Sequence, residues 1–191
     1  KEYRRQRQMC IRDRFIFMEY FIVEEGIMWD TILEILKRKV NEGVEVRFMY
    51  DGMCAFDLLP YSYPKKLQKF GIKCKMSNKI RPFVSTIQNN RDHRKICVID
   101  GQTGYVGGVN LADEYINEKE RFGHWKDTAV MLKGEAVWNM TVMFLHMWNV
   151  INNSSEPIDH EIHMPHRFHQ EPFAGNGFVQ PYSDTPLDGE I

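Results

Sequence analysis

The sequence predicts a layered α/β/α sandwich built around a mixed, largely parallel sheet. Strand-like and helix-like segments alternate through the first 76 residues, which is typical of a parallel sheet covered by helices. Two more strand-like segments follow, close enough for a tight turn to join them, and then a long apolar helical segment. The 191 residues, 43% of them hydrophobic, suffice for one sizeable domain and a fragment of another.

The first two predicted strands flank a helix. Residues 15–23, FIFMEYFIV, are aromatic and β-branched and carry one charge, Glu19, which faces either solvent or a polar cleft. Residues 24–43 place apolar side chains at helical spacing, with acids first, bases late and Gly43 as a stop. Residues 44–51, VEVRFMYD, alternate like a strand.

The next segments predict a short helix, a strand and a β-hairpin. YPKKLQKFG (63–71) is typical of a helix ended by glycine, and IKCKM (72–76) of a strand. HRKICVIDG (93–101) and YVGGVN (105–110) are apolar runs separated by turn-forming residues, which favours an antiparallel pair.

A final strand is predicted at 127–134 and a long helix at 134–152, whose methionine and aromatic side chains most simply form core. The longest uncharged run, 136–155, contains several asparagines and a histidine. We therefore expect a buried amphipathic helix there and no membrane span.

Composition divides the chain into four expected parts. Residues 1–14 are a basic lead-in that does not fit the strand after it and has the character of an artefact. Residues 15–152 form the main domain, and 153–177 are a polar, proline-containing, histidine-rich linker. Residues 178–191 resemble the opening of a second domain that is cut short.

Charge and cysteine content exclude some classes of protein. A net charge of −1 provides no general attraction to nucleic acid, so a nucleic-acid partner is not expected. The four cysteines are widely spaced and lack a C-x-x-C pair, which favours reduced thiols over a disulfide framework. They are Cys10, Cys54, Cys74 and Cys97.

The predicted hairpin carries the candidate catalytic and binding residues. His93 and Lys95 point to the same face of a strand, and Asp100 has the opposite parity. If residues 101–104 form the turn, residue 100 faces 105, 97 faces 108, and Lys95 faces Asn110. Lys95 and Asn110 then form a cross-strand pair on the face of His93.

This set of side chains suits a phosphate group. Lysine and asparagine donate to phosphate oxygens, and Gly107 and Gly108 would let a ligand approach the backbone. A histidine nitrogen can attack phosphorus when a partner holds its other nitrogen, and Asp127 is a candidate for that partner.

A purely structural interpretation of the same residues is also open. A lone strand histidine is more often structural than catalytic, and Lys95 could protect a sheet edge from aggregation. Asp100 and Gly101 would in either case stabilise a turn. The glycines of 101–108 do not have the order of a nucleotide-binding loop, and no Gly-Lys-Ser/Thr follows them.

The spacing as a whole resembles a known signature. His-x-Lys-x(4)-Asp followed by Gly-Gly-x-Asn is similar to the HKD signature of the phospholipase D superfamily. NNRDHRKICVIDGQTGYVGGVNLADEYIN and FGHWKDTAVMLKGEAVW resemble the first half of bacterial cardiolipin synthases, and the likeness runs from about residue 15 to the end.

The resemblance implies a role for each residue. His93 would be one of two active-site histidines, Lys95 and Asn110 would bind phosphate, Asp127 would orient His93, and Asp100 would be the structural acid. In such enzymes one histidine forms a phosphohistidine and the other serves as acid and base. A phosphatidyl group passes between two phosphatidylglycerol molecules, glycerol leaves, and no metal or cofactor takes part.

The resemblance also implies what must complete the site. Only one signature is present, so the partner would be a second phospholipase D-like half of the same protein, or a homodimer mate. We expect the longer protein to work at the cytoplasmic side of the cell membrane, and this fragment to be soluble or peripheral. Alone and undimerised, the fragment would be inactive or nearly so.

Two questions stay open at this stage. His160, His163, His166 and His169 recur every three residues and form either a zinc or nickel site or a solvated linker. The function could also be that of another phospholipase D superfamily phosphodiesterase, such as a phospholipase or nuclease, or of a non-catalytic α/β module.

Overall fold

The computed structural model describes residues 14–52, 57–77, 92–151, 163–165 and 178–183 of the chain. The six strands within this part form one sheet in the order β3-β2-β1-β4-β5-β6. The elements are β1 (Phe15–Tyr20), α2 (Ile27–Asn41), β2 (Glu45–Asp51), α3 (Tyr63–Gln68), β3 (Lys73–Ser77), β4 (Ile96–Ile99), β5 (Thr103–Gly107), the 3₁₀ helix η2 (Asp113–Ile116), β6 (Ala129–Lys133) and α4 (Ala136–Val150).

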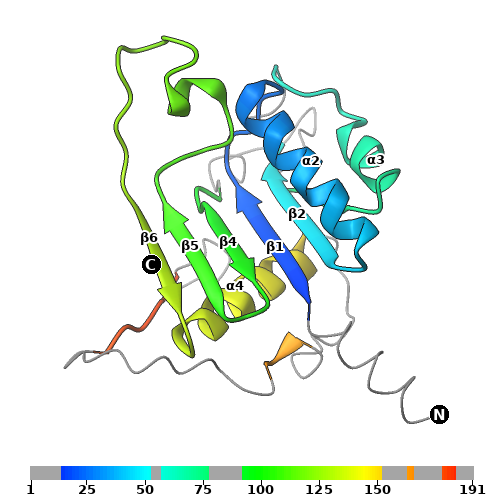
Figure 1. The fold of residues 1–191 in the computed structure, drawn as a ribbon, viewed down its shortest axis with the longest axis vertical. Helices are drawn as coiled ribbons and strands as arrows, with labels where there is room; N and C mark the ends of the chain where they lie inside the picture. The colour runs from blue at the N-terminus through cyan, green and yellow to red at the C-terminus, as the bar shows by residue number, and fades with distance from the viewer. Residues whose placement is uncertain (1–13, 53–56, 78–91, 152–162, 166–177, 184–191) are drawn as a thin grey trace, which may run out of the picture.

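The sheet is mixed, with a parallel half and an antiparallel half (Figure 1). β1, β2 and β3 run parallel, joined by α2 and α3, whereas β4, β5 and β6 pair antiparallel. The mixed sheet and the flanking helices confirm the predicted class, but only two of these five strand pairs are parallel. A loop of only three residues joins β4 to β5, which requires an antiparallel pair, whereas β5 and β6 are antiparallel although the 21 residues 108–128 connect them.

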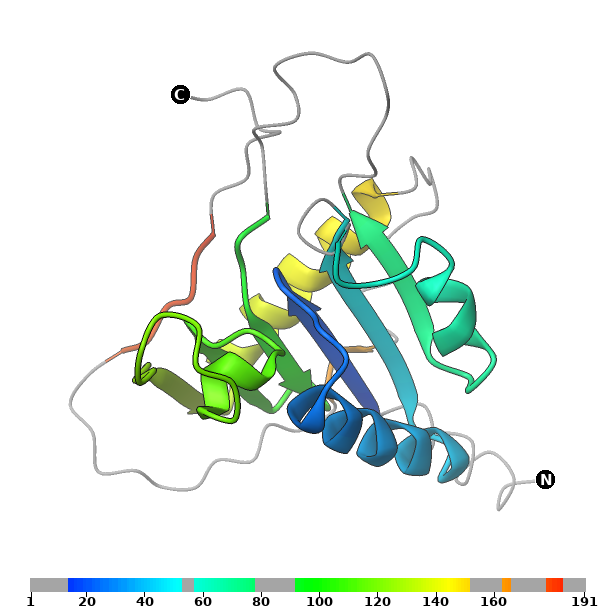
Figure 2. The ribbon, with the colours of Figure 1, turned by 90° about the horizontal axis from the view of Figure 1, so that it is seen from above.

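Helices cover both faces of the sheet, as Figure 2 shows with α2 and α3 on one side and α4 on the other. On the first side Trp29 of α2 stacks on Phe48 of β2, with ring centroids 4.7 Å apart. On the second side Phe144 of α4 stacks on Phe17 of β1 at 4.8 Å. Both faces of β1 are covered, which accounts for the apolar residues on both sides of this strand.

The expectation for α4 is confirmed. Val137, Met140, Phe144, Leu145 and Trp148 are buried against the sheet, so the helix belongs to the core. None of the helices in the described ranges is long and apolar enough to cross a membrane.

The hairpin register differs from the predicted one. Ile99 pairs with Thr103 and Cys97 with Tyr105, so the loop is residues 100–102 and the expected pairs 100–105, 97–108 and 95–110 are wrong. Asp100 and Gly101 both adopt positive φ, at 55° and 63°, which permits the tighter turn. Asn110 consequently lies beyond the end of β5 and is not the cross-strand neighbour of Lys95.

Asp100 anchors this turn to the first residue of β1. Its backbone N–H donates to the carbonyl of Phe15 at 2.9 Å, and the Phe15 N–H donates to Asp100 Oδ1 at 2.8 Å. Aspartate tolerates the left-handed conformation better than most residues. The expectation that Asp100 supports the turn, pointing away from His93, agrees with these contacts.

We predict that Asp100→Ala destabilises the domain by about 2 kcal/mol or more, because it adds left-handed strain and leaves the Phe15 N–H without its acceptor. Asp100→Asn keeps an acceptor and tolerates the same φ, so its loss should be less than about half as large. Urea denaturation of both variants measures the difference. Equal losses for alanine and asparagine would contradict this role.

Candidate functional site

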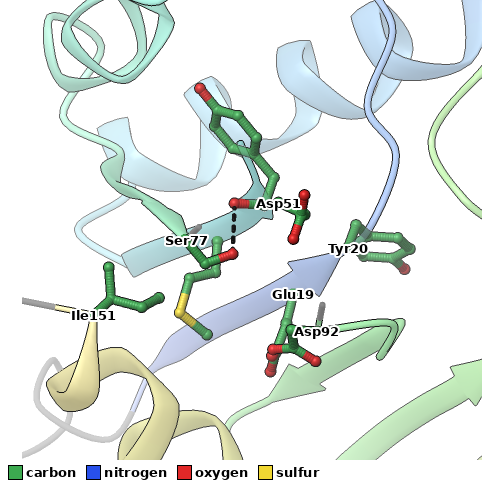
Figure 3. A pocket seen from close by; sticks show the side chains of 8 residues that line it. Glu19, Tyr20, Asp51, Ser77, Asp92 and Ile151 are labelled. Carbon is green, nitrogen blue, oxygen red and sulfur yellow. Dashed lines mark hydrogen bonds between the residues drawn. The ribbon is translucent and has the colours of Figure 1, made fainter. Parts of the chain in front are cut away.

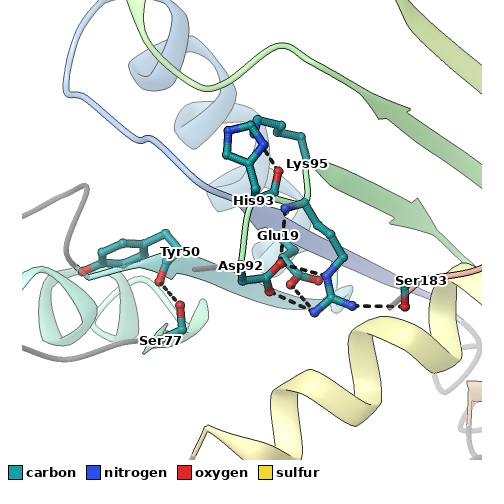
Figure 4. Close-up of polar contacts among 8 residues, drawn as sticks. Glu19, Tyr50, Ser77, Asp92, His93, Lys95 and Ser183 are labelled. Atoms are coloured by element: carbon teal, nitrogen blue, oxygen red, sulfur yellow. Dashed lines mark hydrogen bonds and ion pairs between the residues drawn. The ribbon is translucent and has the colours of Figure 1, made fainter. Parts of the chain in front are cut away.

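His93 and Lys95 lie at the carboxyl end of the parallel strands. The ladder between β1 and β4 has Ile96 opposite Glu19, so residues 92–95 precede the first ladder pair of β4. Figure 4 shows His93 and Lys95 on one side of this segment, and Asp92 on the other. The predicted shared face of His93 and Lys95 is therefore confirmed.

The two side chains contact each other. Lys95 Nζ lies 2.9 Å from His93 Nδ1 and donates to the His93 carbonyl oxygen at 2.6 Å. Phe21 packs beside them, with its ring centroid 4.5 Å from that of His93 and 5.1 Å from Lys95 Nζ. Lys95 is buried and His93 is exposed, so the imidazole is accessible while the ammonium lies behind it.

This contact determines the state of the imidazole. A protonated lysine has no lone pair, so His93 Nδ1 is the acceptor and the ring hydrogen lies on Nε2. The pKa of His93 is lowered by partial burial and then by the charge of Lys95, while Asp92 opposes the shift. Both main causes favour a neutral imidazole, which is the form that can act as a nucleophile or base.

Asn110 is brought to the same edge of the sheet by a loop. Its Oδ1 accepts the N–H of Ile22 at 3.0 Å, and its Nδ2 donates to the hydroxyl of Tyr115 at 2.8 Å. Ile22 follows Phe21, the ring beside His93 and Lys95, so Asn110 fixes the backbone next to the site. Asn110 is also buried.

Gly107 and Gly108 leave space for a neighbouring segment of the chain, which the sequence did not reveal. A Cβ on Gly108 would lie 2.4 Å from Asp127 Oδ1, and a Cβ on Gly107 would lie 2.8 Å from the Thr128 carbonyl oxygen. The Cβ positions missing from these residues are thus filled by the segment that leads into β6. The predicted approach of a ligand to these glycines stays a prediction.

Asp127 does not contact His93 in this structure. Its carboxylate accepts the Trp125 Nε1–H at 3.2 Å and the Thr128 N–H at 2.7 Å. Within the described part of the chain it makes no hydrogen bond to His93, whose Nδ1 faces Lys95. The orienting role of Asp127 therefore remains a prediction.

A buried charge cluster lies on the opposite side of the histidine segment, and sequence reasoning missed it. Glu19 is 3% exposed and lies 3.1 Å from the Arg94 guanidinium. Arg94 Nε and Nη2 also donate to the two carboxylate oxygens of Asp92 at 2.8 and 2.9 Å. The one signal in the sequence was the single charge within an apolar strand.

The cluster borders a small pocket (Figure 3). Burial and the neighbouring Asp92 raise the pKa of Glu19 well above its usual value, although Arg94 opposes this shift. Burial alone would raise the pKa of Asp92, but its contacts with Glu19 and Arg94 outweigh burial and lower it. The pocket is lined by Glu19, Tyr20, Met49, Tyr50, Asp51, Ser77, Asp92 and Ile151.

The histidine repeat is only partly described. His160, His166 and His169 lie outside the described residues. His163 is buried and makes edge contacts with the rings of Phe15 and Phe17, and its Nε2 lies 3.3 Å from Glu45 Oε2. Among the residues that the structure describes, no group of three or more potential ligands could hold a metal ion.

We predict that Lys95→Met raises the pKa of His93 toward its usual value, because the nearby positive charge disappears while the effect of burial persists. An NMR titration of the imidazole measures this shift. Lys133→Met, an exposed change at the far end of β6, serves as the control. A lower His93 pKa in Lys95→Met would contradict the assigned electrostatics.

We predict that Glu19→Gln flattens the decline of stability with pH. A buried acid whose pKa is raised contributes stability below its unfolded pKa of 4.5, and that contribution is lost as pH rises toward its folded pKa. The effect is about 1.4 kcal/mol per unit of pKa shift. Unfolding free energies between about pH 5 and 8 test it. Exposed Glu34→Gln is the control, and parallel curves for wild type and Glu19→Gln would refute the prediction.

Comparisons with known proteins show which proteins the chain is similar to. An uncharacterized protein of Streptococcus mutans serotype c is 54% identical over 185 residues, covering 97% of this chain and 39% of that protein. A cardiolipin synthase of Alkalihalophilus pseudofirmus is 40% identical over 138 residues, covering 72% of this chain and 27% of the enzyme. The chain thus spans well under half the length of both relatives.

A solved structure shows the same fold. NucT from Helicobacter pylori superposes with a TM-score of 0.50 at 13% identity, covering 75% of this chain and 89% of that one. The family model described as "Cardiolipin synthase, PLD-like domain" matches residues 12–148, which include the whole sheet and most of α4. The chain therefore belongs to the cardiolipin synthase family of phospholipase D-like domains.

Proposed function

We propose that this chain is the first catalytic half of a phosphatidyltransferase that joins two phosphatidylglycerol molecules and releases glycerol. The observation that carries the proposal is the contact of His93 with Lys95 in the segment just before β4, in a chain of the cardiolipin synthase family. Imidazole and ammonium together suit attack on a phosphodiester, since one attacks phosphorus and the other stabilises the added negative charge.

The reaction proceeds by two displacements at phosphorus. A nitrogen of His93 attacks the phosphodiester, a P–N bond forms, and the P–O bond to glycerol breaks as an acid from the second half protonates the leaving oxygen. The same group then takes the proton from a hydroxyl of the second phosphatidylglycerol. That oxygen attacks phosphorus, the P–N bond breaks, and His93 is regenerated.

Binding of the phosphate would rearrange the contact seen in this structure. Attack by Nε2 requires the ring hydrogen to be on Nδ1, yet Lys95 now points its ammonium at Nδ1. A phosphate oxygen is a stronger partner for Lys95 than a neutral imidazole, so it would draw the ammonium away. Nδ1–H would then be available to Asp127, the partner that the family resemblance implies.

The rest of the molecule fits a shared active site. We propose that residues 15–152 are the first half, that 153–177 link it to a second half, and that 178–191 begin that half. The completing partner is this second half or a homodimer mate, and the longer protein works on the cytoplasmic side of the cell membrane. A net charge of −1 argues against a nuclease, which would be expected to carry a basic groove for a polyanionic backbone.

The protein that contains this chain should transfer phosphatidyl groups between phosphatidylglycerol molecules in vesicles, and His93→Ala should lower the rate by at least about 100-fold. His146→Ala, an exposed change on α4, is the matched control. The rate should be unchanged in EDTA. If this protein cleaves DNA and leaves phosphatidylglycerol intact, it is a nuclease, and if it does neither, the catalytic proposal fails.

Covalent labelling assigns the role of His93. A nucleophilic His93 gives a phosphoenzyme that is stable to base and labile to acid, and His93→Ala abolishes it. If labelling survives in His93→Ala, His93 is the acid and the second half supplies the nucleophile. Absence of any label in the active protein would refute the covalent mechanism.

A further inference from the structure

We propose that Arg94, held between Glu19 and Asp92, is a positioning residue that fixes the His93–Lys95 segment for phosphate binding. The proposal rests on the proposed function, because it concerns how that phosphate site is held in place. None of the three cluster residues belongs to the His-x-Lys-x(4)-Asp pattern itself.

The segment that carries His93 and Lys95 lies outside the strand ladder. β4 begins at Ile96, so His93 and Lys95 precede the strand pairs that hold the sheet together. A catalytic group must be held within a fraction of an ångström, and a misplacement of about 1 Å can cost about 100-fold in rate. Side-chain contacts therefore have to restrict this segment.

The contacts of Arg94 connect the segment that carries His93 to strand β1. Glu19 is opposite Ile96 in the ladder, so its carboxyl group is anchored to the central strand β1. Arg94 lies 3.1 Å from Glu19 and binds Asp92 through two nitrogens, while the Arg94 N–H donates to Asp92 Oδ1 at 3.2 Å. The Arg94 guanidinium thus connects Asp92 and Arg94, the residues directly before and after His93, to the sheet (Figure 4).

Side chains alternate between the two sides of the segment 92–95. Figure 4 shows His93 and Lys95 on one side and Asp92 on the other, and Arg94 binds Asp92 through two nitrogens on that second side. The charge cluster can therefore hold the backbone without occupying the space in front of the imidazole. Arg94 Nη1 also lies 3.5 Å from the hydroxyl of Ser183, which follows the expected linker.

Burial of this charge cluster costs free energy. The side chains of Glu19, Asp92 and Arg94 are 4%, 8% and 20% exposed. Buried charges of this kind are often no more stabilising than an apolar replacement, so the cluster is poorly explained by stability alone. Removing one partner leaves the others uncompensated, and that sensitivity makes a direct test possible.

The ligand-free chain provides the first test. In Arg94→Gln, amides of residues 93–96 should exchange with solvent about tenfold or more faster relative to those of β1 and β2. The His93 pKa should rise, because Asp92 without its arginine partner acts more strongly on the imidazole. Glu19→Gln keeps a polar side chain beside Arg94 and should change both readouts much less.

Arg47→Gln is the matched control. Arg47 has a side chain 16% exposed and pairs with Glu45 at 2.9 Å, but it lies at the amino end of β2, the opposite end of the sheet from His93. It should leave the His93 pKa and the relative exchange of residues 93–96 unchanged. If Arg94→Gln merely speeds exchange throughout the sheet, as a lost structural contact would, the positioning role is overturned.

Inorganic phosphate provides the second test and separates the two proposals. Its dissociation constant, followed by the His93 resonances of the folded chain, should increase about tenfold or more in Arg94→Gln. Lys95→Met should weaken phosphate binding as well. If Lys95→Met weakens phosphate and Arg94→Gln does not, the positioning role fails alone. If wild type and Lys95→Met respond alike, the phosphate site of the proposed function fails, and the ligand-free readouts still decide the role of Arg94.

Discussion

The central strands β1 and β2 are buried on both faces, so polar, reactive side chains are confined to the ends of these strands, and this constraint shapes the site. β1 is apolar on both sides because helices cover both. Its one charge, Glu19, lies one residue before the carboxyl end of the strand and meets Arg94 there. The segment that carries His93 is thus attached to the carboxyl end of β1, where the apolar core ends.

The two sides of that segment have different electrostatic tasks. On one side Lys95 is buried behind an exposed imidazole and favours its neutral form. On the other side Asp92, whose pKa is lowered, balances the positive charge of Arg94, while Glu19, whose pKa is raised, adds a second polar partner. Lys95 and Arg94 therefore both lie near His93, but only the charge of Lys95 lowers the pKa of the imidazole.

The hairpin between β4 and β5 shows how the backbone conformation of a turn determines where a site residue lies. Positive φ at Asp100 and Gly101 shortens the loop to three residues, and the register shifts by three. Asn110 then leaves the strand and bonds to the backbone of Ile22. The residue types of the signature are unchanged, but Asn110 supports the site through the loop after β1 and not through a strand pair.

Hydrophobic periodicity and turn residues predicted the main helices and strands around the site, because burial imposes a period of two on strands and about 3.6 on helices. The predicted strands 93–101 and 105–110 were too long, however, since β4 begins only at Ile96 and β5 ends at Gly107, which leaves His93, Lys95 and Asn110 outside the strands. The same periodicity placed His93 and Lys95 on one face. It could not give the hairpin register, which depends on the φ angles of Asp100 and Gly101. Nor could it pair Glu19 with Arg94, because 75 residues of chain separate them and only the packing of β4 against β1 brings them together. Periodicity is a local consequence of burial, whereas charge pairing depends on which strands become neighbours.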